Sequence, residues 1–573
     1  MNPRARYALI LGAMGLIGVL ATALLLLDPP PSRSGGFGPP PDPAAQDASG
    51  PDTRVALAEG WDGNTVCYEI FVRSFQDSDG DGIGDFRGLT ERLDYVNDGD
   101  PDGGDDLGAD CIWLMPTFPT ESYHGYDVTD YRGVNPELGT MEDFQAFLAA
   151  AHARGIRVLL DLVINHSSDR HPWFVDAASG PDAEHRDWYR FADAPGPDNE
   201  YGDNNWRPVP GGDGYYYGFF SGRMPDLDWE SPAVREEMKR ISDFWLLEVG
   251  VDGFRLDAVR HLMEDDAGVS TNVPRTHDML AELGGHIRET APGAFTVGEV
   301  FDSTAALVPY YPDQFDSFFA FQVANGIVDA ARTGSPARLM AAVAEAQETL
   351  PGHRWSTFIR NHDQVRAMTE LGGDVGRAKV AASLLLTLPG VPFVYYGEEI
   401  GMSGTKPDPR LRTPMHWEPG RAAGFTTGVP WEPLQTDSAS ANVAAQAGDP
   451  ASLLAHYRRL IHLRTAEPAL GTGVWVPVDP GVEGVAAYLR GTTTEAVLVA
   501  VNLRDTASEL LAPAAPPGIL PAGVFRYEGV EGFTPAGLDP APWNVDEADT
   551  DLGAIPSLPP HGTAVLRIVP DGG

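Results

Sequence analysis

Short apolar runs alternate along the chain with stretches in which apolar residues recur every three or four positions. The short runs, bounded by turn-forming residues, predict β-strands, and the longer stretches predict amphipathic helices. Eight strands separated by helices over roughly 400 residues predict an α/β protein built as a (β/α)8 TIM barrel, because a doubly wound open sheet is usually shorter. The predicted strands are Val66–Val72, Cys111–Met115, Arg157–Val163, Gly253–Val259, Phe295–Val300, Phe315–Phe321, Ser356–Arg360 and Pro392–Tyr396, and the predicted helices include Met141–Arg154, Arg235–Val249, Pro336–Thr349 and Val375–Leu388.

One strand-to-helix connection is far too long for a simple barrel. After Val163 the next helical stretch begins only near Ser231, and the sequence between them is rich in Asp, Gly, Pro, Trp and Tyr. Structureless loops of that length are uncommon in compact domains, so we expect a small inserted domain after the third strand. Beyond the helix Leu453–Arg464, alternating strands such as Val485–Leu489 and Ala496–Val501 predict a C-terminal antiparallel β-sandwich.

The N-terminus predicts export of the chain. Arg4 and Arg6 precede an uncharged apolar run, Tyr7–Leu27, that is long enough to span a bilayer as a helix. Basic residues before such a run favour an N-terminus inside the cell and a body outside it. The run predicts either an uncleaved membrane anchor or a cleaved signal peptide, and both place the body of the chain outside the cytoplasm. The predicted organisation is 1–27 for this segment, 28–60 for a Pro- and Gly-rich linker, 61–166 and 231–468 for the barrel, 167–230 for the inserted domain and 469–573 for the C-terminal domain.

Charge and cysteine content narrow the possible partners. Forty Lys and Arg residues stand against 82 Asp and Glu residues, a formal net charge of −42. Such a surface repels nucleic-acid phosphates and anionic lipid heads, so we expect no nucleic acid partner and membrane contact only through the N-terminal segment. We also expect a monomer. The only two cysteines, Cys67 and Cys111, lie in apolar strand-like runs, and we expect small core residues rather than a disulfide framework.

Polar side chains follow several of the predicted barrel strands. In a TIM barrel the reacting groups lie on the loops at the C-terminal ends of the strands. An isolated carboxylate at such a position is often structural, but several strand ends that carry carboxylates or histidines indicate a catalytic site. These residues are Asn165 and His166 after the third strand, Arg255, Asp257, Arg260 and His261 on and after the fourth, Glu299 after the fifth, and His362 and Asp363 after the seventh.

The chemistry of this set is that of a retaining glycosidase. Arg255 and Asp257 are two positions apart on a strand, so their side chains share one face. A guanidinium group nearby lowers the pKa of a carboxylate and keeps it ionised, as a nucleophile requires. Glu299, on the next strand, could protonate the leaving oxygen, because double displacement at a sugar carbon uses one ionised and one protonated carboxyl group. A third carboxylate, Asp363, could stabilise the transition state together with the histidines.

Several segments resemble the signature regions of glycoside hydrolase family 13, the α-amylase family. They are DLVINH (161–166), GFRLDAVRH (253–261), GEV (298–300) and IRNHDQ (359–364), with further matches in CYEIFVRSF (67–75), YHGYD (123–127), MPDLD (224–228) and PGVPFVYYGEE (389–399). The resemblance implies an α-glucan substrate such as starch or maltooligosaccharides. It implies Asp257 as nucleophile, Glu299 as acid/base and Asp363 as transition-state stabiliser, with Arg255, His166, His362 and Tyr126 around the bound sugar.

Two Ca²⁺ sites are expected. The segment from Asp77 to Asp85 places oxygen donors at alternating positions, like the start of an EF-hand loop, but position twelve is Gly88 rather than Glu. It resembles instead the calcium loop of α-glucosidases in the family, which implies Asp77, Asp79, Asp81, Asp85 and the Ile83 carbonyl as ligands. The family's α-amylases hold a second calcium between barrel and insert, and the matching positions are Asn165, Asp226 and the backbone carbonyl of His261.

The family resemblance leaves the type of activity open. His261 after Arg260 resembles α-amylases, in which these residues serve the leaving-group side. Asp127 and Arg412 resemble exo-acting α-glucosidases, in which an Asp/Arg pair closes the pocket around the non-reducing end. We expect retaining hydrolysis of α-1,4-glucosidic bonds by an α-amylase, with an exo-acting α-glucosidase, an oligo-1,6-glucosidase or a transglycosylase as alternatives. A noncatalytic, membrane-anchored glucan-binding or transporter-accessory protein is disfavoured, because all three carboxylates are present.

Overall fold

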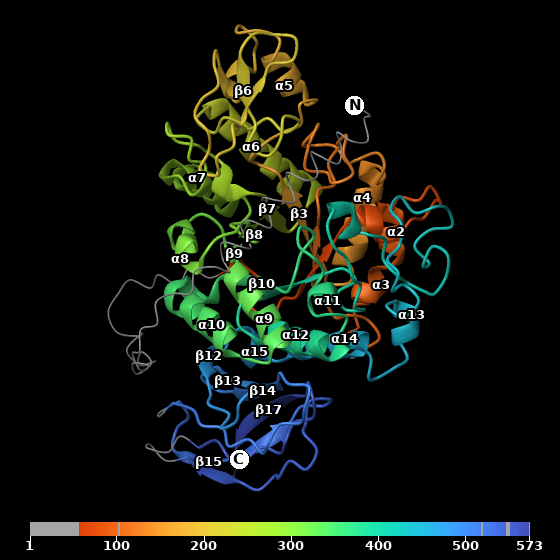
Figure 1. Ribbon diagram of the computed structural model, residues 1–573, viewed down its shortest axis with the longest axis vertical. Helices are drawn as coiled ribbons and strands as arrows, with labels where there is room; N and C mark the ends of the chain where they lie inside the picture. The colour runs from red at the N-terminus through yellow and green to blue at the C-terminus, as the bar shows by residue number, and fades with distance from the viewer. Residues whose placement is uncertain (1–56, 101–102, 517–518, 546–550, 572–573) are drawn as a thin grey trace.

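The computed structural model describes residues 57–100, 103–516, 519–545 and 551–571 (Figure 1). The apolar run Tyr7–Leu27 and nearly all of the predicted linker lie outside the described residues. Within the described ranges, no helix combines the length and the apolar character needed to cross a bilayer. Residues 57–60, assigned above to the linker, lie against the barrel, because Ala58 is buried and the backbone N–H of Glu59 donates to the Pro292 carbonyl.

The eight predicted barrel strands are present and close into a parallel barrel, which confirms the predicted fold class. Their order around the barrel follows the chain, and the last strand pairs with the first. The strand β7 is shorter than predicted: it ends at Leu256, because Ala258 adopts the left-handed conformation (φ 48°) and a 3-10 turn follows. The barrel strands are β1 (Cys67–Ile70), β2 (Cys111–Leu114), β3 (Arg157–Leu162), β7 (Gly253–Leu256), β8 (Phe295–Gly298), β9 (Ser317–Phe319), β10 (Trp355–Phe358) and β11 (Val391–Tyr395).

Helices surround the barrel, and several of them bury one face against it. In α4 (Met141–His152), a capping box between Thr140 and Asp143 starts the helix, and Phe144, Phe147, Leu148 and Ala151 form its buried face. The predicted helix Arg235–Val249 is α6 (Pro232–Asp243) followed by a π-helical turn, 244–249. The other helices are α2 (Phe86–Glu91), α3 (Leu93–Val96), α7 (Pro274–Thr290), α8 (Thr304–Leu307), α9 (Phe321–Thr333), α10 (Ala337–Thr349), α11 (Ala367–Glu370), α12 (Val375–Thr387), α13 (Val443–Gln446), α14 (Leu453–Ala466) and α15 (Pro468–Gly471).

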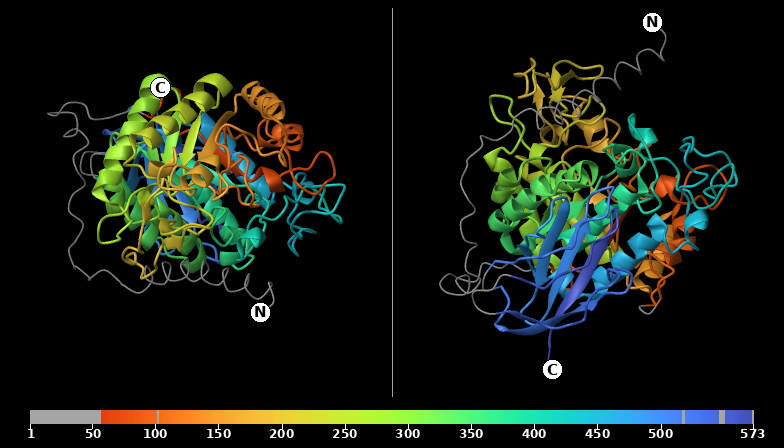
Figure 2. Two further views of the ribbon diagram at one scale, coloured as in Figure 1. Left: turned by 90° about the horizontal axis from the view of Figure 1, so that it is seen from above. Right: turned by 60° about the horizontal axis from the view of Figure 1, so that its bottom comes forward.

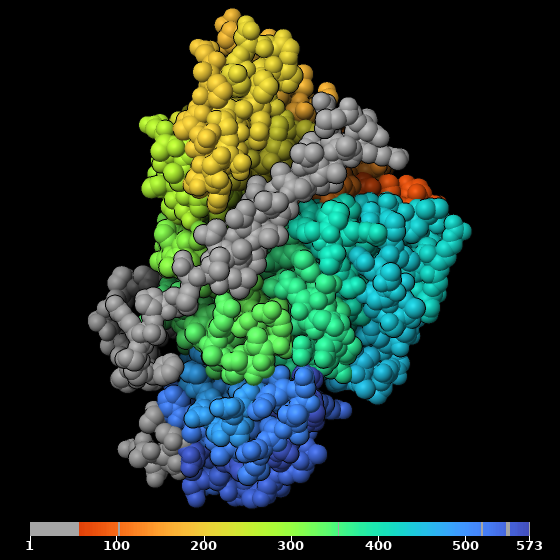
Figure 3. All heavy atoms as spheres, viewed as in Figure 1, coloured from red at the N-terminus to blue at the C-terminus, as the bar shows by residue number. Residues whose placement is uncertain are grey.

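The inserted domain is a small antiparallel sheet with one short helix. Its strands are β4 (Phe191–Ala192), β6 (Tyr215–Tyr217) and β5 (Trp206–Pro208), in that order across the sheet. The helix α5 (Pro172–Ala177) was not predicted; Pro172 begins it, and the His171 side chain accepts from the backbone N–H of Trp173. The insert and the C-terminal domain project from opposite ends of the barrel (Figures 1 and 3).

The C-terminal domain is built on a six-stranded antiparallel sheet (Figure 2, right). Alternate residues of its central strands face opposite sides: Tyr488 and Val499 join the barrel core, and Leu489 and Leu498 face a second layer. That layer contains isolated bridges, such as Leu511 to Ile555, in place of long strands. In sheet order the strands are β12 (Val474–Pro477), β13 (Val485–Gly491), β14 (Ala496–Asn502), β17 (Thr563–Pro570), β15 (Gly523–Gly529) and β16 (Trp543–Val545).

The expectation for the two cysteines was wrong. Cys67 and Cys111 form a disulfide between β1 and β2. The two residues are directly opposite each other in the parallel pairing of these strands, with Cα atoms 4.3 Å apart. They are 44 positions apart in the chain, so the local pattern around each cysteine gave no sign of their common register.

Candidate active site

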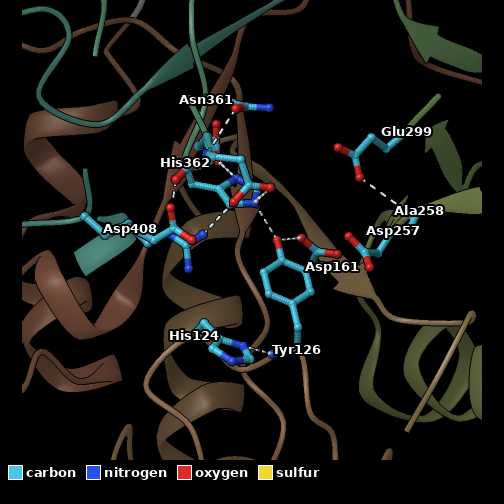
Figure 4. A network of polar contacts seen from close by, with 12 residues as sticks. His124, Tyr126, Asp161, Asp257, Ala258, Glu299, Asn361, His362 and Asp408 are labelled. Carbon is cyan, nitrogen blue, oxygen red and sulfur yellow. Dashed lines mark hydrogen bonds and ion pairs between the residues drawn. The ribbon is translucent and has the colours of Figure 1, made fainter. Parts of the chain in front are cut away.

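A buried arginine organises the ends of three barrel strands. Arg255, on β7, is completely buried and its guanidinium donates from Nη1 to Asp257 (2.7 Å) and from Nη2 to Glu299 (2.5 Å). Nη1 also donates to both carboxylate oxygens of Asp161 on β3 (2.8 and 2.9 Å). Neighbouring nitrogens of one planar group therefore hold the two predicted catalytic carboxyls side by side, and Figure 4 shows them adjacent at the strand ends.

Burial and the charge of Arg255 oppose each other at both carboxyls. At Glu299, burial and the negative charges of Asp257 and Asp363 raise the pKa, Arg255 lowers it, and the net result is a pKa of about 7. Burial also raises the pKa of Asp257, and the Arg255 guanidinium opposes that rise. At neutral pH the pair can therefore hold one proton, with Glu299 as the proton-bearing member.

Asp363 is fixed by positive groups at the opposite side of the cleft. Nearly half of its side-chain surface (48%) is exposed, so it faces the space where a substrate would lie. Its carboxylate accepts from Arg412 Nη2 (2.6 Å) and lies 3.4 Å from His362 Nε2. Burial would raise its pKa, but the His362 ring, Arg412 and Lys406 outweigh burial and hold the pKa well below its ordinary value. Because burial lowers the pKa of His362 and keeps the ring neutral, we assign the larger effect to the full charge of Arg412.

Tyr126 lies between the two groups of carboxylates. Its ring is stacked on His362 (centroids 5.7 Å apart, 18° between planes), and its hydroxyl is 2.7 Å from His362 Nε2. The hydroxyl donates to Asp161 (3.1 Å) (Figure 4). Asp161 was not predicted as a site residue, although it begins the DLVINH segment. It is 1% exposed, and burial raises its pKa to about 7.

Histidines border the cleft where the inserted domain meets the barrel. Burial lowers the pKa of His166 to about 4 and that of His261 well below its ordinary value, so both rings are neutral. Phe219 of the insert stacks on His261 (4.2 Å), and Phe220 lies 5.2 Å from the His166 ring. These two phenylalanines were not predicted as site residues. Arg260 donates to the hydroxyl of Tyr201 (2.7 Å), also from the insert.

Asp127 and Arg412, which resemble the Asp/Arg pair of exo-acting α-glucosidases, are each bound to other partners. Asp127 accepts from the hydroxyls of Thr120 (2.5 Å) and Ser122, and Arg412 binds Asp363 and the His362 carbonyl. Hydroxyl groups just before the YHGYD segment therefore satisfy the Asp127 carboxylate locally. Both residues remain near the cleft, but they do not form the Asp/Arg pair expected for a closed exo-acting pocket.

Three of the predicted calcium ligands come together after β1. One carboxylate oxygen from each of Asp77, Asp79 and Asp85 lies within 4.8 Å of the others. Asp81 is outside that group and accepts from the backbone N–H of Ile83 (2.8 Å). Oxygen donors are what Ca²⁺ prefers, and three like charges at this spacing repel one another unless a cation neutralises them, so the loop fits Ca²⁺.

The second predicted calcium site is less fully assembled. Asn165 Nδ2 donates to the His261 carbonyl (2.6 Å), so two of the expected ligands contact each other. The third, Asp226, is buried, and its Oδ2 has no hydrogen-bond partner within the described part of the chain. Burial and the negative charge of Glu264 raise the pKa of Asp226. The unpartnered oxygen fits a cation, whereas the His261 carbonyl accepts from Asn165 Nδ2 and Asn165 Oδ1 lies 3.0 Å from His166 Nδ1.

Comparison with known proteins gives a consistent result. Residues 69–473 match the model of the alpha amylase catalytic domain. The chain is 38% identical over 450 residues to "Alpha-amylase 3" of Dictyoglomus thermophilum, and the match covers 78% of this chain and 86% of that protein. It is 34% identical over 510 residues to the "Trehalose synthase" of Pimelobacter sp., covering 77% of this chain and 87% of the relative. It is 32% identical over 522 residues to the "Oligo-1,6-glucosidase" of Parageobacillus thermoglucosidasius, covering 78% of this chain and 91% of the relative. The crystal structure of the alpha-amylase from H. orenii superposes with a TM-score of 0.76 at 38% identity, covering 88% of this chain and 100% of that one.

Proposed function

The chain belongs to the α-amylase family of glycoside hydrolases, and we propose that within this family it is an α-amylase that hydrolyses α-1,4-glucosidic bonds in starch and maltodextrins with retention of configuration. The observation that carries the proposal is the pair Asp257 and Glu299, held on neighbouring nitrogens of Arg255. Retention requires two carboxyl groups close enough for one to attack the sugar carbon while the other protonates the leaving oxygen.

The proposed reaction has two steps. In the first, the ionised Asp257 attacks the anomeric carbon while Glu299 gives its proton to the leaving glycosidic oxygen, which leaves a glycosyl ester on Asp257. In the second, Glu299, now ionised, takes a proton from water as the water oxygen attacks the same carbon and Asp257 departs. Asp363, kept ionised beside Arg412, stabilises the positive charge that develops on the sugar in both steps.

Two observations favour an α-amylase over an exo-acting α-glucosidase. The relative and the solved structure named as α-amylases are each 38% identical to the chain, against 32% for the oligo-1,6-glucosidase. In addition, Arg412 binds Asp363 rather than Asp127, so the side-chain pair expected to close an exo-acting pocket is not formed.

The time course of maltoheptaose breakdown tests the proposal. An α-amylase releases a spread of short oligomers from the first minutes, whereas glucose as the sole early product would indicate an α-glucosidase, and conversion of maltose to trehalose would indicate a trehalose synthase. Glu299→Gln should lose reducing-sugar release by at least about 1000-fold while still binding maltoheptaose in calorimetry. Binding without turnover by the wild type would favour the noncatalytic alternative.

We further propose that the loop of Asp77, Asp79 and Asp85 holds a structural Ca²⁺ and that the protein works outside the cytoplasm. The first rests on the converging carboxylates. The second rests on the N-terminal apolar run and is supported by the Cys67–Cys111 disulfide, because disulfides persist in oxidising compartments.

A further inference from the structure

A buried carboxyl group lies directly behind one of the histidines of the cleft. Glu69 is on β1, in the segment CYEIF, and His362 follows β10. Glu69 Oε1 is 2.5 Å from His362 Nδ1, and the two residues are 2% and 0% exposed. Glu69 therefore contacts the side of the imidazole that faces away from the cleft, where no substrate can reach it.

The contacts of the other ring nitrogen decide where its proton lies. Tyr126 gives its only hydroxyl proton to Asp161 (3.1 Å), so its oxygen can only accept from His362 Nε2, 2.7 Å away. The second neighbour of Nε2 is the ionised Asp363 (3.4 Å), which also only accepts. Nε2 therefore carries a hydrogen and donates it to the Tyr126 hydroxyl oxygen, with the Asp363 carboxylate beside it.

Nδ1 must then either accept a hydrogen bond from a neutral Glu69 or carry a second proton beside an ionised Glu69. Burial favours the neutral form of both partners: it raises the pKa of Glu69 and lowers that of His362, each well away from its ordinary value. An isolated ion pair at this depth would also have to overcome the cost of removing two charges from water. The charged groups that act on the pair are Arg255, Asp161 and Asp363 around Glu69, and Asp363, Arg412, Arg255 and Lys406 around His362.

We propose that Glu69 is a positioning residue which, as a neutral carboxylic acid, donates to His362 Nδ1 and holds His362 as the Nε2–H tautomer. The inference rests on the proposed function, because the hydrogen it fixes lies beside Tyr126 and Asp363, the two residues expected to contact the bound sugar. With Nδ1 occupied, His362 cannot switch to the tautomer that would turn an Nε2 lone pair towards Tyr126 and Asp363. The donor is thus in place before the substrate arrives.

Replacing Glu69 with two different residues separates this role from simple packing. Glu69→Gln keeps the size of the side chain and an N–H that can donate to Nδ1, so kcat should stay within about threefold of the wild type, with the pH profile unchanged. Glu69→Leu keeps the bulk but has no donor, so kcat should fall by about 10- to 100-fold, the range typical for lost partners of functional histidines, with a smaller change in KM. Tyr68→Phe is the matched control, since it removes a buried hydroxyl from the same strand that contacts Glu399 rather than His362.

A second readout does not depend on turnover. Nitrogen-15 NMR of labelled histidine should show His362 as the Nε2–H tautomer in the wild type and in Glu69→Gln, and as a mixture in Glu69→Leu. A Glu69→Gln enzyme as impaired as Glu69→Leu, or a doubly protonated His362 in the wild type at neutral pH, would overturn the proposal. If the wild type cleaves no α-glucan, the proposed function fails, but the tautomer measurement still decides the role of Glu69.

Discussion

At the scale of single residues, Arg255 sets the protonation of the catalytic pair by contacting both of its members. It lies 2.7 Å from Asp257 and 2.5 Å from Glu299, so its charge favours ionisation of both. Burial opposes that ionisation and raises the pKa of both carboxyls, that of Glu299 to about 7. The first proton to be lost is therefore that of Asp257, which leaves Glu299 as the acid.

The pH dependence of kcat/KM should show this division. Glu299 must be protonated for the first step, so kcat/KM should fall as the pH rises through about 7, approaching tenfold per pH unit above it. Asp257 must be ionised, and because burial raises its pKa, activity should be lost on the acid side at a pH above about 4, where a free aspartate would already be charged. Initial rates on maltoheptaose between pH 4 and 9 measure both limbs. Full activity at pH 9 would contradict the assignment of Glu299 as the acid.

The residues that could be predicted from the sequence are those that end a strand. Asp257, Glu299 and Asp363 each stand where an apolar run meets a loop, and a barrel brings such positions together. Glu69 and Asp161 were missed because each lies within an apolar strand, where a lone carboxyl group has no local partner to reveal its role. Their partners come from strands far away in the chain, and only the closed barrel places them within hydrogen-bonding distance.

At the scale of elements, the loop after β1 supports the segment that carries Arg412. The Thr426 hydroxyl donates to Asp77 Oδ2 (2.5 Å), and the backbone N–H of Asp77 donates to the Phe425 carbonyl. Ser74, just before the loop, donates to the Arg412 carbonyl (2.5 Å). A cation that stiffens this loop would therefore also stabilise the segment that holds Asp363 through Arg412.

Calcium should raise the melting temperature through this loop. Asp79→Asn removes one charge from the three converging carboxylates but keeps an oxygen that can accept from the backbone N–H of Asp81, so folding itself should be little affected. We expect Ca²⁺ at about 100 times its Kd to stabilise the wild type by about 2.7 kcal/mol, and the variant by much less at the same concentration. Asp98→Asn is the control, because Asp98 makes the same kind of turn in an acidic surface loop. Equal shifts for wild type and Asp79→Asn in calorimetry with Ca²⁺ and with a chelator would contradict the proposed site.

The elements also show where prediction from local pattern ends. Periodicity placed all eight barrel strands, because each is a short, mainly apolar run. It missed α5, a six-residue helix too short to show a repeat, and it overran β7, where Ala258 leaves the strand through a left-handed turn. It also gave no register between strands, so the pairing of Cys67 with Cys111 could not be foreseen.

At the scale of the whole molecule, the C-terminal sheet is docked onto the barrel by a buried polar contact as well as by apolar packing. One face of the sheet, including Tyr488 and Val499, continues the barrel core. Within that interface Arg490, on β13, is completely buried and donates to the carbonyls of Thr387 (2.8 Å), Gly473 (2.9 Å) and Gly471 (3.3 Å). Burial and the nearby Arg464 lower the pKa of Arg490, so holding its charge there depends on these acceptors.

Loss of this contact should therefore destabilise the two domains together. Arg490→Leu leaves buried carbonyls without a donor, and each unsatisfied acceptor costs about 1–3 kcal/mol, so we expect the free energy of unfolding to fall by several kcal/mol. Arg526→Leu is the matched control, because Arg526 lies on β15 of the same sheet and pairs with the exposed Glu528, and a surface ion pair contributes little to stability. Urea unfolding, followed by tryptophan fluorescence and far-UV circular dichroism, should show one transition at lower urea for Arg490→Leu and almost no change for Arg526→Leu. If Arg490→Leu unfolded in two separated transitions with the barrel unaffected, the sheet would be an independent appendage, and the barrel core would not depend on its docking.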